Sequence, residues 1–244
     1  MPRVVCGPGT YAGRRLGFCM PLPSIQTVTG WYDQSAAGYD AGHHATQRKY
    51  KVIEQSLRGL LSRGRVLDLG CGTGRLLNRE DSGRVVGLDL SIEMLRLAHQ
   101  TSPSVLRADG HHLPFASESF DAVVAAQGVI RYMDPAQAFA EIHRVLTPGG
   151  RCAVHQFGSG VSLRQLVRQH VLRRPAPPAD DFVLLDAEEL ARPARGAGLR
   201  VHEVELFRSI RRYPYALRVH PKLPSRVSDA LWNHCVLHLQ KPLS

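Results

Sequence analysis

The segment VLDLGCGTG, residues 66–74, decides the fold of this chain. It joins a short apolar run, 66–69, to three glycines at alternate positions, Gly70, Gly72 and Gly74. An apolar run of this length, bounded by turn residues, predicts a buried strand. Glycines allow positive φ angles and let a ligand approach the backbone closely. We therefore predict a strand that ends in a ligand-binding loop.

This loop lacks the features of the common phosphate-binding loops. The dinucleotide motif Gly-x-Gly-x-x-Gly requires a third glycine where this chain has Arg75. A P-loop requires Gly-Lys followed by Ser or Thr, and the sequence contains no such tripeptide. The loop therefore suits a ligand that has an adenosine but no pyrophosphate.

Apolar runs and helical periodicity alternate along the chain around this loop. The predicted strands are 66–69, 85–88, 105–106, 120–126, 152–154, 199–207 and 236–239. The predicted helices are one from 46 to near 64, then 75–79, 92–99, 135–146 and one that begins at Asp186. Continuous apolar strands that alternate with helices are typical of a parallel sheet covered on both faces. Such sheets bind ligands beyond the carboxyl ends of their strands.

Length and composition fit one α/β domain with additional segments. The chain has 244 residues, of which 43% are hydrophobic, which is ample for a core. We divide it into an irregular N-terminal arm, residues 1–30, and a single domain, 31–244. Within that domain, 64–157 is the ligand-binding core, and 158–232 comprises a Pro-rich linker, a helix and a basic, aromatic insertion.

Asp89 is the second signal of a ligand site. It ends the next predicted strand, 19 residues after Gly70. A carboxylate at that place can accept hydrogen bonds from both hydroxyls of a ribose. Its other possible role is the N-cap of the following helix, but Ser91 is better placed for that. We therefore predict that Asp89 binds a ribose.

The cysteines and the apolar segments exclude several classes. The five cysteines are scattered without a CxxC pair, so neither a zinc site nor a disulfide framework is indicated, and we expect no metal. No apolar run reaches the roughly 18–20 residues that span a bilayer. The apolar stretch after Arg14-Arg15 is shorter than an export signal requires. We therefore expect a cytoplasmic protein.

The net charge of +10 lies outside the core. Residues 1–63 carry eight basic and three acidic residues, 64–151 carry nine and ten, and 159–226 carry thirteen and seven. This distribution favours an acidic partner or substrate at the flanks. GC-rich coding would also enrich the chain in Arg, although it does not explain the uneven placement.

Five motifs in order resemble those of class I S-adenosylmethionine-dependent methyltransferases, in the small-molecule and ubiquinone-type branch. They are 66–74, 87–91, 108–110 with 113–115, 119–121, and 144–151. The residues Tyr32-Asp33, Ala36 and Tyr39-Asp40 are similar to the opening of that branch, and the resemblance covers about 31–157. It implies a doubly wound, Rossmann-like α/β fold. In this fold a seven-stranded, mostly parallel sheet has an antiparallel last strand and carries helical cap segments.

The resemblance also implies S-adenosylmethionine as the cofactor, and it assigns residues to it. They are Tyr39, Asp68, Gly70, Gly72, Gly74, Asp89, Leu90, Met94, Asp109, Gly110 and Gln127. Asp68 and the glycine loop would hold the amino and carboxylate groups, and Asp109 would accept from the adenine amino group. Gln127 would lie near the sulfonium, and Tyr39 would close over the cofactor.

The implied function is methyl transfer to a small-molecule or lipid-like acceptor, which the basic flanks suggest is anionic. Segments 1–29 and 158–232 would form the acceptor side, and a homodimer is compatible with the insertion. One alternative is an RNA methyltransferase. The sequence shows neither a recognisable RNA-binding module nor an Asn-Pro-Pro-Tyr-type tetrapeptide, which argues against this alternative. Another is a protein that binds the cofactor but transfers no methyl group.

The sequence identifies no catalytic base. Tyr132 and His155 follow predicted strands near the expected methyl position, and Arg131 adjoins the first. We interpret His155 as structural. The basic and aromatic residues of 208–232, among them Arg211 and Arg212, suit either an anionic acceptor or packing at the sheet edge.

Overall fold

The computed structural model describes residues 10–11, 14–15, 23–42, 47–157, 187–210, 213–219 and 234–243. The predicted linker after residue 157, the predicted helix start at Asp186, and Arg211 and Arg212 lie outside the described residues.

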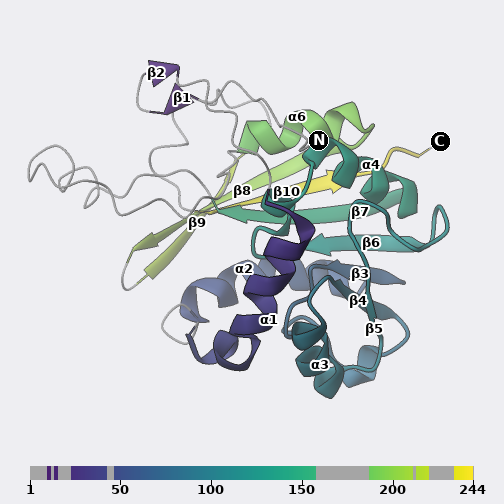
Figure 1. Ribbon diagram of the computed structural model, residues 1–244. Coiled ribbons are helices and arrows are strands. Elements are labelled where there is room, and N and C mark those ends of the chain that lie inside the picture. The colour runs from purple at the N-terminus through teal and green to yellow at the C-terminus, as the bar shows by residue number, and fades with distance from the viewer. Residues whose placement is uncertain are drawn as a thin grey trace, which may run out of the picture.

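An eight-stranded sheet forms the centre of the molecule (Figure 1). Its strands, in sheet order, are β5 (Val105–Arg107), β4 (Val85–Asp89), β3 (Val66–Leu69), β6 (Phe120–Ala125), β7 (Leu146–Phe157), β10 (His234–Gln240), β8 (Arg200–Ile210) and β9 (Tyr213–Val219). The first five are mutually parallel, and β10 runs antiparallel to both β7 and β8. The predicted seven-stranded, mostly parallel sheet is confirmed.

Strand β9 is an addition to the predicted sheet. It pairs antiparallel with β8 at the sheet edge, within the segment predicted as an insertion. Proline cannot donate to a strand ladder and is tolerated on edge strands. The edge position of β9 therefore accommodates Pro214.

Helices cover both faces of the sheet. They are α1 (Ile25–Gly42), α2 (Gln47–Leu61), α3 (Ile92–Thr101), α4 (Pro135–Val145) and α6 (Ala187–Gly196). In Figure 1, α4 and α6 lie on one face and α2 and α3 on the other. Each face has its own apolar cluster, with Phe139 and Leu190 in one and Leu57 and Ala98 in the other. In the described part of the chain, no helix combines the length and the apolar character needed to cross a membrane.

The helix starts follow capping rules. The Ser91 side chain accepts a hydrogen bond from the Met94 amide, which confirms Ser91 as the N-cap of α3. Pro135 occupies the first turn of α4, and Asp134 caps that helix by accepting from two of its amides.

The predicted helix 75–79 is wrong. The chain forms turns there and then a 3-10 helix, η2 (Arg79–Asp81). The Asn78 side chain caps η2 by accepting from the Glu80 amide. Only three residues then separate Gly74 from this cap, too few for a helical turn of their own.

The predicted irregular arm, 1–30, is too long at its C-terminal end. Helix α1 begins at Ile25, because the Ser24 hydroxyl accepts a hydrogen bond from the Thr27 amide at 3.1 Å and so satisfies a first-turn donor. In the rest of the arm, the described residues form only a short antiparallel pair, β1 (Thr10–Tyr11) with β2 (Arg14–Arg15).

Candidate functional site

A pocket lies at the carboxyl ends of β3, β4 and β6, and α1 covers it. Figure 1 shows α1 in front of these strand ends. The pocket brings together all the predicted cofactor residues except one. Those that line it are Tyr39, Asp68, Gly70, Gly72, Asp89, Leu90, Met94, Asp109, Gly110 and Gln127. Residues at or after the carboxyl ends of four strands, β3, β4, β5 and β6, therefore meet residues of α1 and α3 at one place.

Gly74 is the exception. It has a φ of +82°, and a Cβ atom there would stand 3.0 Å from the Cα and Cβ atoms of Ala98 on α3. At Gly74 the end of the loop thus packs tightly against α3, and a contact of Gly74 with the cofactor stays a prediction. Gly70 has a similar constraint, because its Cβ would stand 2.5 Å from the Val129 side chain.

Asp68 is a buried carboxylate that faces this pocket, and its Oδ1 atom has no hydrogen-bond partner among the described residues. Burial raises its pKa from 3.8 to about 7, and the nearby Asp89 carboxylate adds to the rise. An unpaired buried carboxylate is costly. A ligand that brings a hydrogen-bond donor or a positive charge to Asp68 would remove that cost.

Asp89 connects the glycine loop to α3. Its Oδ2 atom accepts from the Gly72 amide and its Oδ1 atom from the Ser91 amide, both at 2.9 Å. Burial raises the pKa of Asp89, while these amides oppose the rise. Each carboxylate oxygen can accept a further hydrogen bond. Asp89 can therefore bind a hydroxyl pair, and it also organises the loop, a role that the sequence did not reveal.

Two carboxylates of α1 hold that helix over the pocket. Asp40 accepts from the Thr73 hydroxyl at 3.1 Å. Asp33 accepts from the Ser91 hydroxyl and, at 3.2 Å, from the Glu93 amide at the start of α3. These bonds position Tyr39 at the pocket.

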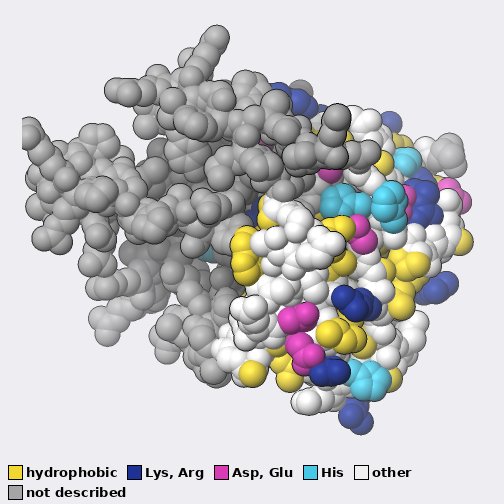
Figure 2. Space-filling view, viewed as in Figure 1, with side chains coloured by type: hydrophobic (Ala, Val, Ile, Leu, Met, Phe, Trp, Pro, Cys, Tyr) yellow, Lys and Arg dark blue, Asp and Glu magenta, His cyan; other side chains and the backbone are white. Residues whose placement is uncertain are grey.

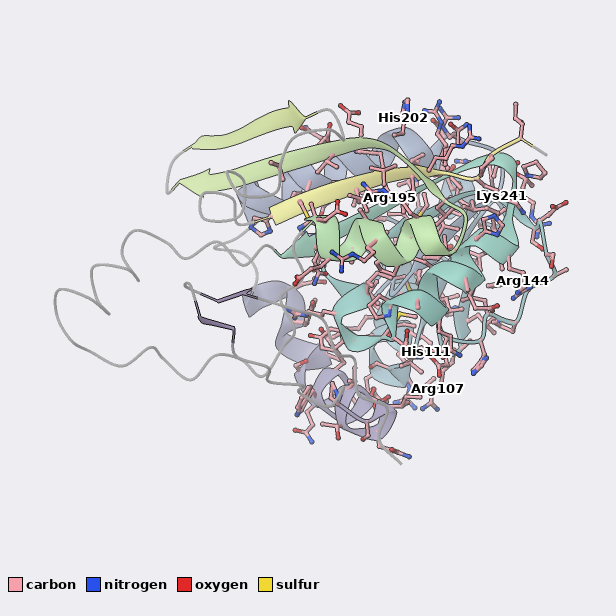
Figure 3. The ribbon with its side chains drawn as sticks, turned by 90° about the horizontal axis from the view of Figure 1, so that it is seen from above. Arg107, His111, Arg144, Arg195, His202 and Lys241 are labelled. Carbon is pink, nitrogen blue, oxygen red and sulfur yellow. The ribbon has the colours of Figure 1, made fainter. Side chains whose placement is uncertain are left out.

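His111, which the sequence analysis missed, fixes the Asp109 side chain. Its Nδ1 atom lies 2.7 Å from Asp109 Oδ1, and its Nε2 atom accepts from the Asp134 amide at 2.9 Å. A ring nitrogen that accepts carries no proton, so Nδ1 holds the proton and donates to Asp109. His111, labelled in Figure 3, lies in the loop after β5, and its Nε2 contact joins that loop to the N-cap of α4. The Asp-x-His spacing was the signal available in the sequence.

Gln127 lines the pocket with a positive φ of 54°, uncommon outside glycine. Its amide donates to His155 Nδ1 at 3.0 Å, and the Gly128 amide donates to the His155 carbonyl at 2.9 Å. His155 is fully buried and does not line the pocket. Burial lowers its pKa well below the usual value, and the positive charges of His234 and Arg131 add to this. This geometry supports a structural role for His155.

A cluster of titratable groups lies elsewhere, on β8 and β10. Glu203, Glu205 and His238 each bring one potential metal ligand within 4.8 Å of the others. Glu205 also accepts from the Ser56 hydroxyl of α2, and it stands opposite Arg218 of β9 in the strand register. These residues share no position with the pocket lining, so they take no part in the site.

Comparison with known proteins agrees with this geometry. Residues 67–154 match the family described as methyltransferase domain. The ubiquinone/menaquinone biosynthesis C-methyltransferase UbiE of Syntrophotalea carbinolica is 32% identical over 206 residues, which cover 74% of this chain and 85% of that protein. The chain belongs to this methyltransferase family. The predicted family, and with it S-adenosylmethionine as the family's cofactor, is confirmed.

Other relatives of this chain are matched over shorter stretches. The demethylmenaquinone methyltransferase of Lactiplantibacillus plantarum is 38% identical over 144 residues, 52% of this chain and 61% of that protein. The chain spans between 49% and 61% of the length of the first three curated relatives that it matches.

Solved structures share the fold at low identity. A SAM-dependent methyltransferase from Thermotoga maritima, titled a possible histamine N-methyltransferase, has a TM-score of 0.68 at 20% identity and covers 87% of this chain and 99% of its own. The [4+2]-cyclase SpnF has a TM-score of 0.66 at 18% identity, with 92% and 99% covered. Because the second is named for a different reaction, the fold alone does not fix the activity.

The residues of the pocket fit the family's cofactor. Asp68 lines the pocket, and its Oδ1 has no hydrogen-bond partner among the described residues, so an ammonium group bound beside this carboxylate would offset the cost of its burial. Around Gly72 no atom lies within 4 Å of the position that a Cβ would take, so the loop leaves space for a ligand there.

Proposed function

We propose that this chain transfers the methyl group of S-adenosylmethionine to a small-molecule acceptor of the quinone type. The buried Asp68 carboxylate at the end of β3, whose Oδ1 has no hydrogen-bond partner among the described residues, is the observation that carries the proposal, because a cationic or donating ligand would offset the cost of its burial. Relatives named for demethylmenaquinone and ubiquinone/menaquinone methylation support the acceptor class.

The cofactor, when bound, supplies a methyl group activated by positively charged sulfur. In this proposal Asp68 holds the amino group, and Asp89 accepts from the ribose hydroxyls. Asp109, oriented by His111, accepts from the adenine amino group. Gln127 lies towards the sulfonium, on a backbone that His155 holds. These residues orient the methyl group and contribute chiefly by alignment.

In this proposal helix α1 excludes water from the pocket. Its contacts through Asp33 and Asp40 keep Val28 and Tyr32 at the pocket. Ile25 and Val129 also line it, so part of the wall is apolar. An apolar wall suits a ring or hydrocarbon acceptor and lowers the access of water to the reacting groups.

The RNA alternative has no support in these observations. The relatives reported above are named for quinones, and on the face shown in Figure 2 the described Lys and Arg side chains stand among acidic and hydrophobic ones. An anionic acceptor, a homodimer, a cytoplasmic location, and an acceptor side built from segments 1–29 and 158–232 stay predictions.

The test uses methyl-labelled S-adenosylmethionine and reduced 1,4-naphthoquinone, an acceptor that lacks a ring methyl group. Incorporation of label into the naphthalene ring is expected. S-adenosylmethionine binding without transfer to this or any fraction of a cell extract would favour the second candidate, a cofactor-binding protein with another reaction, which the SpnF fold makes a concrete alternative.

Replacing Gly72 with Ala should weaken cofactor binding, whereas replacing Gly83 with Ala should cost similar stability and leave binding unchanged. Gly72 (φ +54°) and Gly83 (φ +84°) both have open space at the Cβ position, but only Gly72 lines the pocket. Each Ala variant should lose about 1–2 kcal/mol of stability through the left-handed backbone. Only Gly72→Ala should bind S-adenosylhomocysteine at least about tenfold more weakly, about 1.4 kcal/mol.

Calorimetry with S-adenosylhomocysteine and thermal unfolding of both variants measure these effects. Equal affinities in Gly72→Ala and Gly83→Ala would show that the ligand does not approach the loop at Gly72.

A further inference from the structure

Three side chains form a hydrogen-bonded group at the pocket wall that the proposed cofactor contacts do not use. They are Tyr32 of α1 and Arg131 and Tyr132 of η3 (Val129–Tyr132), and we call them the tyrosine–arginine group. The Tyr32 hydroxyl donates to the Tyr132 oxygen at 2.8 Å, and the Arg131 guanidinium donates to the same oxygen at 2.6 Å. Tyr32 and Tyr132 line the pocket, whereas Arg131 is not among the lining residues and contacts Tyr132.

Ring contacts strengthen this arrangement. The two tyrosine rings meet edge to face, with centroids 5.8 Å apart and an interplanar angle of 89°. The Arg131 guanidinium carbon lies 4.8 Å from the centroid of the Tyr132 ring. Both geometries are favourable for aromatic and cation–π contacts. The position of the Tyr132 oxygen is therefore fixed by contacts to its ring as well as to its hydroxyl.

Both sides of the group are anchored. Helix η3 follows Gln127 and Gly128, whose amides are held by His155. Tyr32 lies on α1, which Asp33 and Asp40 fasten to the cofactor side. Burial raises the pKa of Tyr32, so its phenol keeps its proton and serves as a donor to Tyr132.

The chemistry of this oxygen points to a ligand with an oxygen of its own. A hydroxyl that accepts two hydrogen bonds, one of them charge-assisted, becomes a stronger donor itself. Arg131 adds a positive charge close to the same point. The neighbouring wall is apolar, with Ile25, Val28 and Val129. An apolar ring that bears a hydroxyl or an oxyanion complements this surface.

We infer that Tyr132, polarised by Arg131 and oriented by Tyr32, binds a ring oxygen of the reduced, quinone-type acceptor. The inference rests on the proposed function and deepens it by naming acceptor-binding residues. In such an acceptor, negative charge on the oxygen is shared with the adjacent ring carbon. Tyr132 and Arg131 position and stabilise that charge, and neither takes a proton from the acceptor.

The experiment measures binding of two probes that differ by one oxygen. 1-Naphthol and naphthalene are titrated into the protein saturated with S-adenosylhomocysteine, and probe fluorescence reports binding. The wild type should bind 1-naphthol about tenfold more tightly than naphthalene, as a charge-assisted contact implies. Tyr132→Phe and Arg131→Gln should each lose most of this preference, and Tyr32→Phe should lose about half of it on a logarithmic scale.

Arg96→Gln is the matched control for the lost charge, because Arg96 is exposed on α3 and pairs only locally with Glu93. It should keep the preference, and every variant should keep the wild-type affinity for S-adenosylhomocysteine. If Tyr132→Phe does not fold, the comparison of Arg131→Gln with Arg96→Gln gives the same answer.

Several outcomes would overturn the inference. They are the absence of a preference in the wild type, a preference that survives both Tyr132→Phe and Arg131→Gln, and a loss of S-adenosylhomocysteine affinity in Tyr132→Phe. The proposed function is tested separately. A protein that shows the preference but transfers no methyl group would sustain the binding inference and refute methyl transfer.

Discussion

Replacing Asp68 with Asn is expected to weaken binding of S-adenosylmethionine about 10- to 100-fold. The substitution keeps the shape of the side chain but removes the negative charge that the cofactor's ammonium group would meet. A hydrogen bond to a charged group contributes about 1.5–3 kcal/mol, which corresponds to that range. The effect should be large because Asp68 is buried and its Oδ1 has no hydrogen-bond partner within the described residues.

The same variant should be more stable than the wild type when no ligand is bound, at pH 8. The folded-state pKa of Asp68 is about 7, above the ordinary value of 3.8. Between these values the folded state binds more protons than the unfolded state, so wild-type stability falls as pH rises from about 4 to about 7. At 1.36 kcal/mol per pKa unit the loss is at most about 4 kcal/mol. Asn carries no charge and avoids this loss.

Urea unfolding of both proteins at pH 4, 6 and 8, without ligand, measures the stability difference. The difference should be small at pH 4, grow through pH 6, and be largest at pH 8. Calorimetry at pH 8 measures the affinity, with Asp81→Asn, a surface carboxylate outside the pocket lining, as the control that keeps wild-type binding. A variant that binds as tightly as the wild type, or that is less stable at pH 8 than at pH 4 relative to it, would contradict the role given to Asp68.

Replacing Asp89 with Ala is the second large effect, with an expected loss of cofactor affinity of about 2–3 kcal/mol, roughly 30- to 150-fold. Two causes combine. The carboxylate that would accept from the ribose is lost, and the amides of Gly72 and Ser91 lose their common acceptor. The middle of the glycine loop should then move more freely.

Asp89→Asn separates the two causes, because its single carbonyl oxygen can still accept from one of these amides. Its loss of affinity should be smaller than that of Asp89→Ala. Calorimetry with S-adenosylhomocysteine measures both affinities, and hydrogen exchange of the Gly72 and Ser91 amides reports on the loop. Wild-type affinity in Asp89→Ala would remove the ribose assignment.

Some sequence predictions failed for local reasons. The helix expected at 75–79 is replaced by turns because the cap at Asn78 begins another element. The predicted irregular arm extended to residue 30 because the segment is rich in Pro and Gly. The structure begins α1 at Ile25, after the Ser24 cap. In each case a single backbone or side-chain contact outweighed a composition-based expectation.

The sequence by itself determined the alternation of strands and helices from α2 to β7, apart from the helix expected at 75–79, together with the glycine loop and the acidic residues at the strand ends. These follow from periodicity, capping and turn chemistry, which act between residues close in the chain. Because parallel strands place their carboxyl ends at one edge, Asp68, Asp89 and Asp109 could be expected to converge without knowledge of the coordinates.

Only the tertiary structure decided which side chains, distant in the sequence, line the pocket together or hold the residues that line it. The Tyr32–Tyr132 hydrogen bond joins residues 100 positions apart. The bond between the Ser91 hydroxyl and Asp33 spans 58 positions, and that between the Gln127 amide and His155 spans 28. Neither helical nor strand periodicity relates such residues, because their distance depends on how the whole chain crosses the sheet. The residues proposed to bind the cofactor could therefore be predicted from local sequence. The position of α1 over the pocket and the contact of Tyr32 with Tyr132 depended on the packed fold.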